Sequence, residues 1–245
     1  SDLLGISYRY NNRIRHNPSR QRISDLDRLP LPARHLFNRQ KYNIKMDFIN
    51  VPGDIIITSR GCPYKCSFCS AGILWDNRYT QRSAANVCME IEFLIDKYGI
   101  EGIKFFDSTF TINRKFILSL CQEFKTRGVD KIPWECEIRA NTVDYELLKI
   151  MKEAGCYYIN MGLESASPRI LRVINKGITV EQVENVIEWA NALKMHTKLF
   201  LTYGHPGETL KDIETTLKFR KKYKDRVSFF AEHVGIMIYP GTEVE

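Results

Sequence analysis

The stretch that decides how this chain is interpreted runs from residue 58 to residue 70 and reads TSRGCPYKCSFCS. It holds Cys62, Cys66 and Cys69 in the spacing C-x3-C-x2-C, directly after the apolar run at 55–57. Cysteine thiolates are the usual protein ligands of iron–sulfur clusters. Three of them on one loop can hold three irons of a [4Fe–4S] cube and leave the fourth iron open. A metal site with an open position is typical of catalysis, whereas structural sites are closed.

A structural zinc site is the other interpretation of this spacing. Zinc in such sites takes four protein ligands at short spacing. No Cys or His lies between Cys69 and Cys88 to supply the fourth. The sequence therefore favours the cluster, and a non-catalytic metal-binding scaffold stays as an alternative.

Length and composition are those of an ordinary globular α/β protein. The chain has 245 residues, enough for one large domain, and 44% of them are apolar. No apolar run approaches the roughly 18 residues of a membrane span, and no signal-peptide pattern is present. The seven cysteines are an odd number and only three cluster, which disfavours a disulfide framework and predicts a reducing, cytoplasmic location.

The positive charge is concentrated near the N-terminus. Residues 1–50 hold eight Arg and two Lys against four Asp, out of a net charge of +7 for the whole chain. A basic arm can bind nucleic acid or a membrane surface, but aromatic and basic residues do not alternate here as in single-strand binders. Nucleic acid is therefore disfavoured, and a solvated linker or a face for an acidic partner domain fits better. We expect residues 1–50 to be a connector or N-terminal extension and residues 51–245 to be the core domain.

From residue 54 onward, apolar runs alternate with helical patterns. Because the runs are nearly continuously apolar, we expect strands buried on both faces, over 54–58, 102–107, 134–139, 157–162, 196–202 and 227–237. Spacings of three and four predict helices between them, with Asn113, Asp144 and Thr179 as N-caps and Gly99 and Gly128 as C-terminal stops. This alternation predicts an α/β fold with parallel strands, a partial (β/α)6 TIM-like barrel with an irregular N-terminal extension.

Three stretches together resemble one known family. They are the cysteine loop with Phe68 just before its third cysteine, GLES at 162–165, and GHPGET at 204–209. In these three stretches the chain resembles the radical S-adenosylmethionine (SAM) superfamily. The resemblance implies that SAM chelates the open iron and is cleaved reductively to a 5′-deoxyadenosyl radical, which removes hydrogen from a substrate. It also implies a reductant such as flavodoxin or ferredoxin, and a small-molecule or lipid-like substrate that the sequence does not identify.

The same resemblance assigns SAM-binding roles to residues at the C-terminal ends of the strands, where barrels of this kind carry their active sites. Asp107, with Ser108 beside it, is expected to receive the amino group, and Arg139 to pair with the carboxylate or with Glu164. Glu164 is expected to contact the ribose or Arg139.

Four further residues complete these expectations. Ser165 would make polar contacts near Glu164, Gly204 would allow close approach of the adenine, and Phe68 belongs to the same site. His205 is interpreted as a polar loop residue, with a substrate acid/base or cobalamin contact as the alternative. No catalytic residue is predicted beyond these, and the remaining cysteines are expected to be small buried hydrophobic residues.

Residues 5–34 resemble the connector that joins a cobalamin-binding domain to the barrel in cobalamin-dependent members. This predicts that the chain is a piece of a longer protein, with cobalamin bound by a domain upstream and a barrel shortened at its C-terminal end. The reaction would then be C–H functionalisation, as methyl transfer or cyclisation. A tRNA-modifying methylthiotransferase is the alternative enzyme, and it is disfavoured because no cysteine precedes Cys62.

Overall fold

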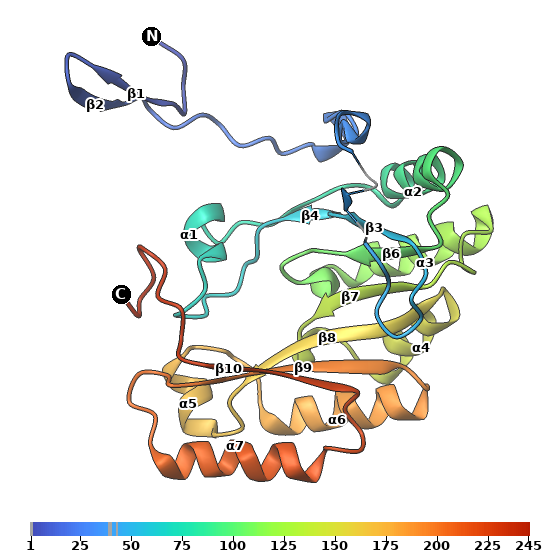
Figure 1. The fold of residues 1–245 in the computed structure, drawn as a ribbon, viewed down its shortest axis with the longest axis vertical. Helices are drawn as coiled ribbons and strands as arrows, with labels where there is room; N and C mark the ends of the chain where they lie inside the picture. The colour runs from blue at the N-terminus through green and yellow to red at the C-terminus, as the bar shows by residue number, and fades with distance from the viewer. Residues whose placement is uncertain (1, 39–40, 43) are drawn as a thin grey trace.

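The computed structural model describes residues 2–38, 41–42 and 44–245. Its main sheet has six strands, all parallel, whose order in space follows their order in the chain. Figure 1 shows them side by side from β3 to β10. The predicted partial barrel is confirmed, and the largest difference in bounds is at the last strand. The strands are β3 (Gly53–Ile56), β6 (Gly102–Phe105), β7 (Trp134–Ile138), β8 (Cys156–Glu164), β9 (His196–Tyr203) and β10 (Phe229–Val234).

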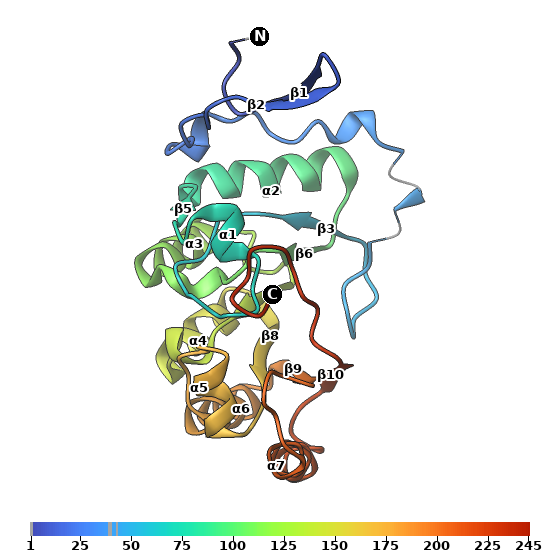
Figure 2. The same ribbon diagram turned by 90° about the vertical axis from the view of Figure 1, so that its left-hand side faces the viewer.

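Helices follow the strands and lie along the outside of the curved sheet (Figures 1 and 2). The predicted caps are confirmed: Asn113 and Asp144 accept hydrogen bonds from the backbone N–H groups of Phe116 and Leu147, at 3.2 and 2.8 Å. Thr179 forms a full capping box. The helices are α1 (Ala71–Trp75), α2 (Ala84–Tyr98), α3 (Arg114–Arg127), α4 (Tyr145–Glu153), α5 (Pro168–Val173), α6 (Val180–Ala192) and α7 (Leu210–Lys222).

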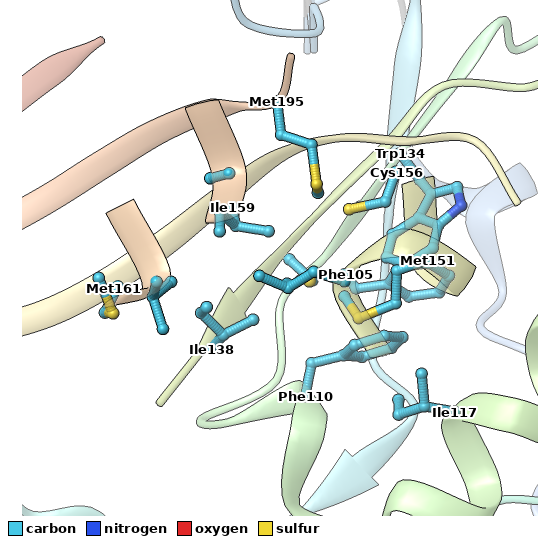
Figure 3. Close-up of a cluster of buried hydrophobic side chains, with 14 of the residues drawn as sticks. Phe105, Phe110, Ile117, Trp134, Ile138, Met151, Cys156, Ile159, Met161 and Met195 are labelled. Atoms are coloured by element: carbon cyan, nitrogen blue, oxygen red, sulfur yellow. The ribbon is translucent and has the colours of Figure 1, made fainter. Parts of the chain in front are cut away.

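The hydrophobic core fills the space between the outer face of the sheet and the helices. Trp134 lies at its centre, fully buried, with ring centroids 5.4 Å from Phe105 and 5.6 Å from Phe110 (Figure 3). Its indole N–H donates to the carbonyl of Ala154 at 2.7 Å, so the one polar atom of this side chain is satisfied. The core thereby fixes the strands whose ends carry the site.

The inner face of the sheet is polar, which corrects the expectation of strands that are apolar on both faces. Glu135 pairs across the sheet with Lys104, Glu137 with Asn160, and Asn160 with Lys198. Cross-strand partners point to the same side of a sheet. The inside of the partial barrel therefore presents charged and amide groups, while the alternate residues fill the core.

A short loop at 45–52, here called the floor loop, packs against the N-terminal end of the sheet. The Phe48 ring stacks on His196 at a centroid distance of 4.4 Å and meets Tyr158 edge-on at 5.0 Å. Tyr157 donates a hydrogen bond to the Asp47 carbonyl at 2.8 Å. These contacts cover the inner face of the sheet at the end opposite the cysteine loop.

The N-terminal segment is not wholly irregular, because strands β1 (Ser7–Tyr10) and β2 (Arg13–His16) form an antiparallel hairpin. Asn11 and Asn12 make its two-residue turn with φ of 47° and 58°. Asparagine tolerates this left-handed geometry, which suits the twist of a hairpin. The Asn-Asn pair therefore builds a turn within a segment that the sequence analysis expected to be irregular. Figures 1 and 2 show the hairpin standing away from the barrel.

Closer to the barrel, the connector is held by ion pairs. The Arg34 guanidinium lies 3.3 Å from Asp54 and 2.6 Å from Glu90, and Arg82 reaches the same Glu90 carboxylate at 2.5 Å. Glu90 is almost fully buried, and a charge in that position needs such partners. Across the described residues, no helix combines the length and apolar character needed to cross a bilayer.

Candidate functional site

The cysteine loop is bracketed by a small antiparallel pair, β4 (Ser59–Arg60) and β5 (Thr80–Gln81). Gly61 follows β4 with φ of +89°, and a Cβ there would lie only 1.9 Å from the Arg78 carbonyl oxygen. The loop therefore needs a glycine at this point, for both its backbone angle and its close packing. This geometry starts the loop in a fixed direction one residue before Cys62.

Asp107 fixes the entry to the same loop from the end of β6. Its buried carboxylate accepts hydrogen bonds from the Thr58 backbone N–H at 3.1 Å, from the Thr58 hydroxyl at 3.1 Å and from the Ser59 hydroxyl at 2.5 Å. Burial raises the pKa of Asp107, and these hydrogen bonds oppose that shift. The carboxylate thus ties the loop to the sheet and does not line the pocket described next.

All three cysteines of the loop line one pocket at the C-terminal ends of β7 and β8. The Arg139 guanidinium lies 3.7 Å from the Cys66 sulfur and stacks over the Tyr64 ring at 3.9 Å. No group of three Cys, His, Asp or Glu side chains among the described residues is placed to hold a single metal ion, but an iron–sulfur cube offers a different iron to each thiolate. The remaining lining residues are Phe68, Ala71, Ser108, Thr109, Glu137, Ile138, Gly162, Glu164, Lys176 and Phe200.

A buried ion pair forms one wall of this pocket. Lys176 lies 2.7 Å from Glu164, and Thr202 donates a hydrogen bond to the other oxygen of that carboxylate at 3.1 Å. Glu164 has φ of +68°, a costly conformation for a residue with a side chain. A Cβ on Gly162 would come within 2.3 Å of the Glu164 carboxylate and 2.8 Å of the Lys176 ammonium. The pair therefore lies directly over the bare backbone of Gly162.

The structure brings four of the seven predicted cofactor-binding residues to the pocket, namely Phe68, Ser108, Arg139 and Glu164. Arg139 and Glu164 are not paired with each other, since Glu164 pairs with Lys176.

The other three, Asp107, Ser165 and Gly204, do not line it. Ser165 is fully buried, with its hydroxyl 3.2 Å from that of Thr216, and the Gly204 N–H donates to Glu208 at 2.6 Å. Asp107, Ser165 and Gly204 each have a hydrogen-bond partner within the protein, and their expected direct contacts with SAM stay a prediction.

His205 is also placed differently from the expectation of a polar loop residue. Its side chain is buried, neither ring nitrogen has a well-aligned hydrogen-bond partner among the described residues, and its ring centroid lies 6.2 Å from that of Phe68. Burial lowers the pKa of His205, so the neutral imidazole is favoured. The sequence placed it on a loop, but the loop folds inward behind Phe68.

Lys176 and Glu137 are the most informative residues that sequence reasoning did not assign to the site. Lys176 lies in the turn after α5. Lysines are seldom buried unless they are paired, so a lysine in the pocket wall would have indicated an ion pair. Glu137 lies two residues before Arg139 on β7, and strand alternation places both on the inner face. Burial raises the pKa of Glu137 to about 7, with the nearby Glu135 charge adding to the shift and Lys198 opposing it.

This pKa predicts that Glu137→Gln stabilises the chain at high pH. A carboxyl that titrates near 7 when folded and near 4.5 when unfolded costs the folded state about 3 kcal/mol once the pH exceeds 7. The cost grows as pH rises from 4.5 to 7 and is absent below that window. Urea unfolding should therefore show Glu137→Gln more stable than the unsubstituted chain at pH 8, with the gap closing at pH 4.5.

The exposed Glu214 on α7 offers the control, because Glu214→Gln should leave the free energy of unfolding unchanged at both pH values. A Glu137→Gln variant whose advantage is the same at low and high pH would contradict the prediction.

The chain is similar to known proteins over most of its length. Residues 56–220 match the family model described as the radical SAM superfamily. Over 99% of its length the chain is 38% identical to an uncharacterised methyltransferase of Pyrococcus horikoshii, of which it covers 51%. Over 88% of its length it is 29% identical to cytidylyl-2-hydroxyethylphosphonate methyltransferase of Streptomyces wedmorensis, of which it covers 42%.

Solved structures share the fold. The cobalamin-dependent SAM radical enzyme OxsB, solved with aqua-cobalamin and SAM bound, superposes with a TM-score of 0.74 at 19% identity, covering 99% of this chain and 34% of that one. The chain thus spans about half or less of the length of these relatives.

Proposed function

This chain belongs to the radical SAM superfamily, and from that premise we propose that it is the catalytic core of an enzyme in which Cys62, Cys66 and Cys69 hold the cluster. The observation that carries the proposal is that all three cysteines line one pocket together with Arg139, Glu164 and Lys176. The family uses a [4Fe–4S] cluster and SAM, and when both are bound the reduced cluster would supply the electron that cleaves the SAM sulfonium. Enzymes of this family need a reductant and act on small-molecule substrates.

The residues of the pocket match the polar ends of SAM. The Arg139 guanidinium offers a planar fork for the SAM carboxylate, and its Nε atom is buried without a partner among the described residues. Glu164 is an acceptor for the ribose hydroxyls, held in place by Lys176 and Thr202. Phe68, 5.7 Å from the Lys176 ammonium, gives an apolar surface between the third cysteine and this wall. The floor loop and the packed core keep water from the far end of the barrel.

We further propose that the whole protein transfers a methyl group and uses cobalamin to do so. Both curated relatives described above are named as methyltransferases, and the likeness to OxsB extends over the N-terminal connector as well as the barrel. Ser165, Asp107 and Gly204 act on this site only through the loops that they hold. A ferredoxin or flavodoxin is the proposed reductant, and its docking surface is not assigned.

The test is anaerobic loading of the full chain with iron and sulfide, followed by reduction in the presence of SAM. We expect 5′-deoxyadenosine to form with methionine, and to be absent without the reductant. In the protein with its cobalamin, SAM labelled in the methyl group should transfer its label to the cobalamin. Label that stays in methionine would favour a cyclase-type reaction. A fully loaded cluster that binds SAM without cleaving it would overturn the proposal in favour of a scaffold.

A further inference from the structure

The polar inner face of the barrel is organised in rows between the floor loop and the cysteine loop. We call Lys104 and Glu135 the lower row, and Glu137, Asn160 and Lys198 the middle row. The register of β7, β8 and β9 places the three middle-row residues side by side, and Figure 1 shows these strands adjacent. The middle row thus lies one step below Arg139 and Gly162, which line the pocket of the cysteines.

The lower row is satisfied by the protein itself. Glu135 lies 3.1 Å from the Lys104 ammonium and accepts a hydrogen bond from the Tyr157 hydroxyl at 3.0 Å. Lys104 also reaches Asp47 of the floor loop at 3.2 Å. Every charged group of this row therefore has a partner within the fold, as a structural role requires.

The middle row is satisfied only in part: the Asn160 side chain donates a hydrogen bond to the Glu137 carboxyl, and the Asn160 Oδ1 atom is left open within the described part of the chain. Asn160 is only 7% exposed, yet its Oδ1 atom has no hydrogen-bond partner among the described residues. Its neighbour Glu137 lines the pocket. Lys198 lies against the faces of Phe200 and Phe229, at 4.9 and 5.7 Å from the ring centroids. Buried acceptors that the protein leaves open are costly unless something else binds them.

We infer that the middle row is the substrate subsite, and that it binds a small molecule through an O–H or N–H donor held between Glu137 and Asn160. The inference deepens the proposed function, on which it rests for the identity of the pocket as the reaction chamber. Glu137 and Asn160 both offer acceptor atoms, which match a hydroxyl or a protonated amine. A carboxylate lacks a donor and, above about pH 7 where Glu137 is ionised, would also meet its negative charge. Specificity then comes from leaving these buried groups unpaired when the wrong substrate enters.

The test uses three probes of similar size, namely 1-propanol, n-propylammonium and propionate, added to the full chain with its cluster in place. Ligand-observed NMR without SAM or reductant measures their binding. A ceiling of about 1.5 kcal/mol per non-hydrogen atom limits probes of about four such atoms to a Kd of roughly 40 μM at best. We expect the alcohol and the ammonium to bind and propionate to bind at least about 10-fold more weakly.

Variants locate the binding. Glu137→Gln should weaken n-propylammonium about 10-fold or more, and Asn160→Ala should weaken both donors about 5-fold. Glu135→Gln is the matched control, because it changes the same residue type on the same face of β7 but in the satisfied lower row, and it should change affinity by less than about 2-fold. Preferred binding of propionate, or equal losses in Glu135→Gln and Glu137→Gln, would overturn the inference. Since no SAM is present, these outcomes are separate from a failure of SAM cleavage, which would overturn only the proposed chemistry.

Discussion

Replacing Cys62, Cys66 or Cys69 with alanine is expected to abolish the loading of iron and sulfide and with it the cleavage of SAM. Each sulfur would serve a different corner of the cube, so no neighbouring thiol replaces it. Changes to residues that only support metal ligands cost about 10–100-fold, so loss of a ligand itself should cost more than about 100-fold. Iron and sulfide content and the yield of 5′-deoxyadenosine from anaerobically loaded protein measure the effect.

Cys88→Ala is the matched control, since Cys88 is fully buried in the core on α2 and lies outside the pocket. It should lose about 1 kcal/mol of stability from a small cavity while keeping its cluster and its SAM cleavage. A loop variant that still loads a full cluster and cleaves SAM would show that the three thiols are not its ligands.

The second large effect is expected from Lys176→Met, which leaves the Glu164 carboxylate buried without its cation. Their side chains are 10% and 11% exposed, so solvent does little to replace the lost partner. Breaking a buried pair by removing one member costs about 3–5 kcal/mol. Urea unfolding should show this loss, and the affinity for SAM should fall as well because Glu164 would no longer be held over Gly162.

Two further variants distinguish the loss of this ion pair from a general loss of stability. Lys222→Met on α7 removes a pair with Glu184 whose lysine side chain is 63% exposed, and it should cost less than about 1 kcal/mol. The double variant Lys176→Met/Glu164→Leu should recover most of the stability lost by Lys176→Met, since apolar residues can replace a buried pair at little cost. Additive losses in the double variant would contradict the coupling.

How much the sequence could predict depended on how far apart the interacting residues are in the chain. Asn113 and Asp144 were recognised as caps because each cap contacts a backbone group only three residues away. Asp107 was expected to bind a ligand, but its partners Thr58 and Ser59 lie 49 and 48 residues earlier, where no local pattern connects them.

The site shows the same limit. Glu164 was predicted as a pocket residue from its motif, whereas its pairing with Lys176 depends on how α5 folds back and could not be derived from spacing alone. The polar inner face was partly visible in the alternation of Glu135, Glu137 and Arg139. Strands of flat parallel sheets are covered by helices on both faces, and this general rule predicted apolar residues on both faces here as well. A partial barrel has a chamber on its inner side, where polar residues can lie.

The hydrogen bonds that Thr58 and Ser59 donate to Asp107 bear on how this protein would recover after oxygen damages its cluster. These hydrogen bonds involve no metal and no cysteine, so the root of the loop keeps its shape whichever inorganic atoms are in place. An oxidised cluster could then be rebuilt on a loop that is already folded, and the barrel would not have to refold. Assembly factors that deliver iron and sulfide would find the three cysteines already lining one pocket.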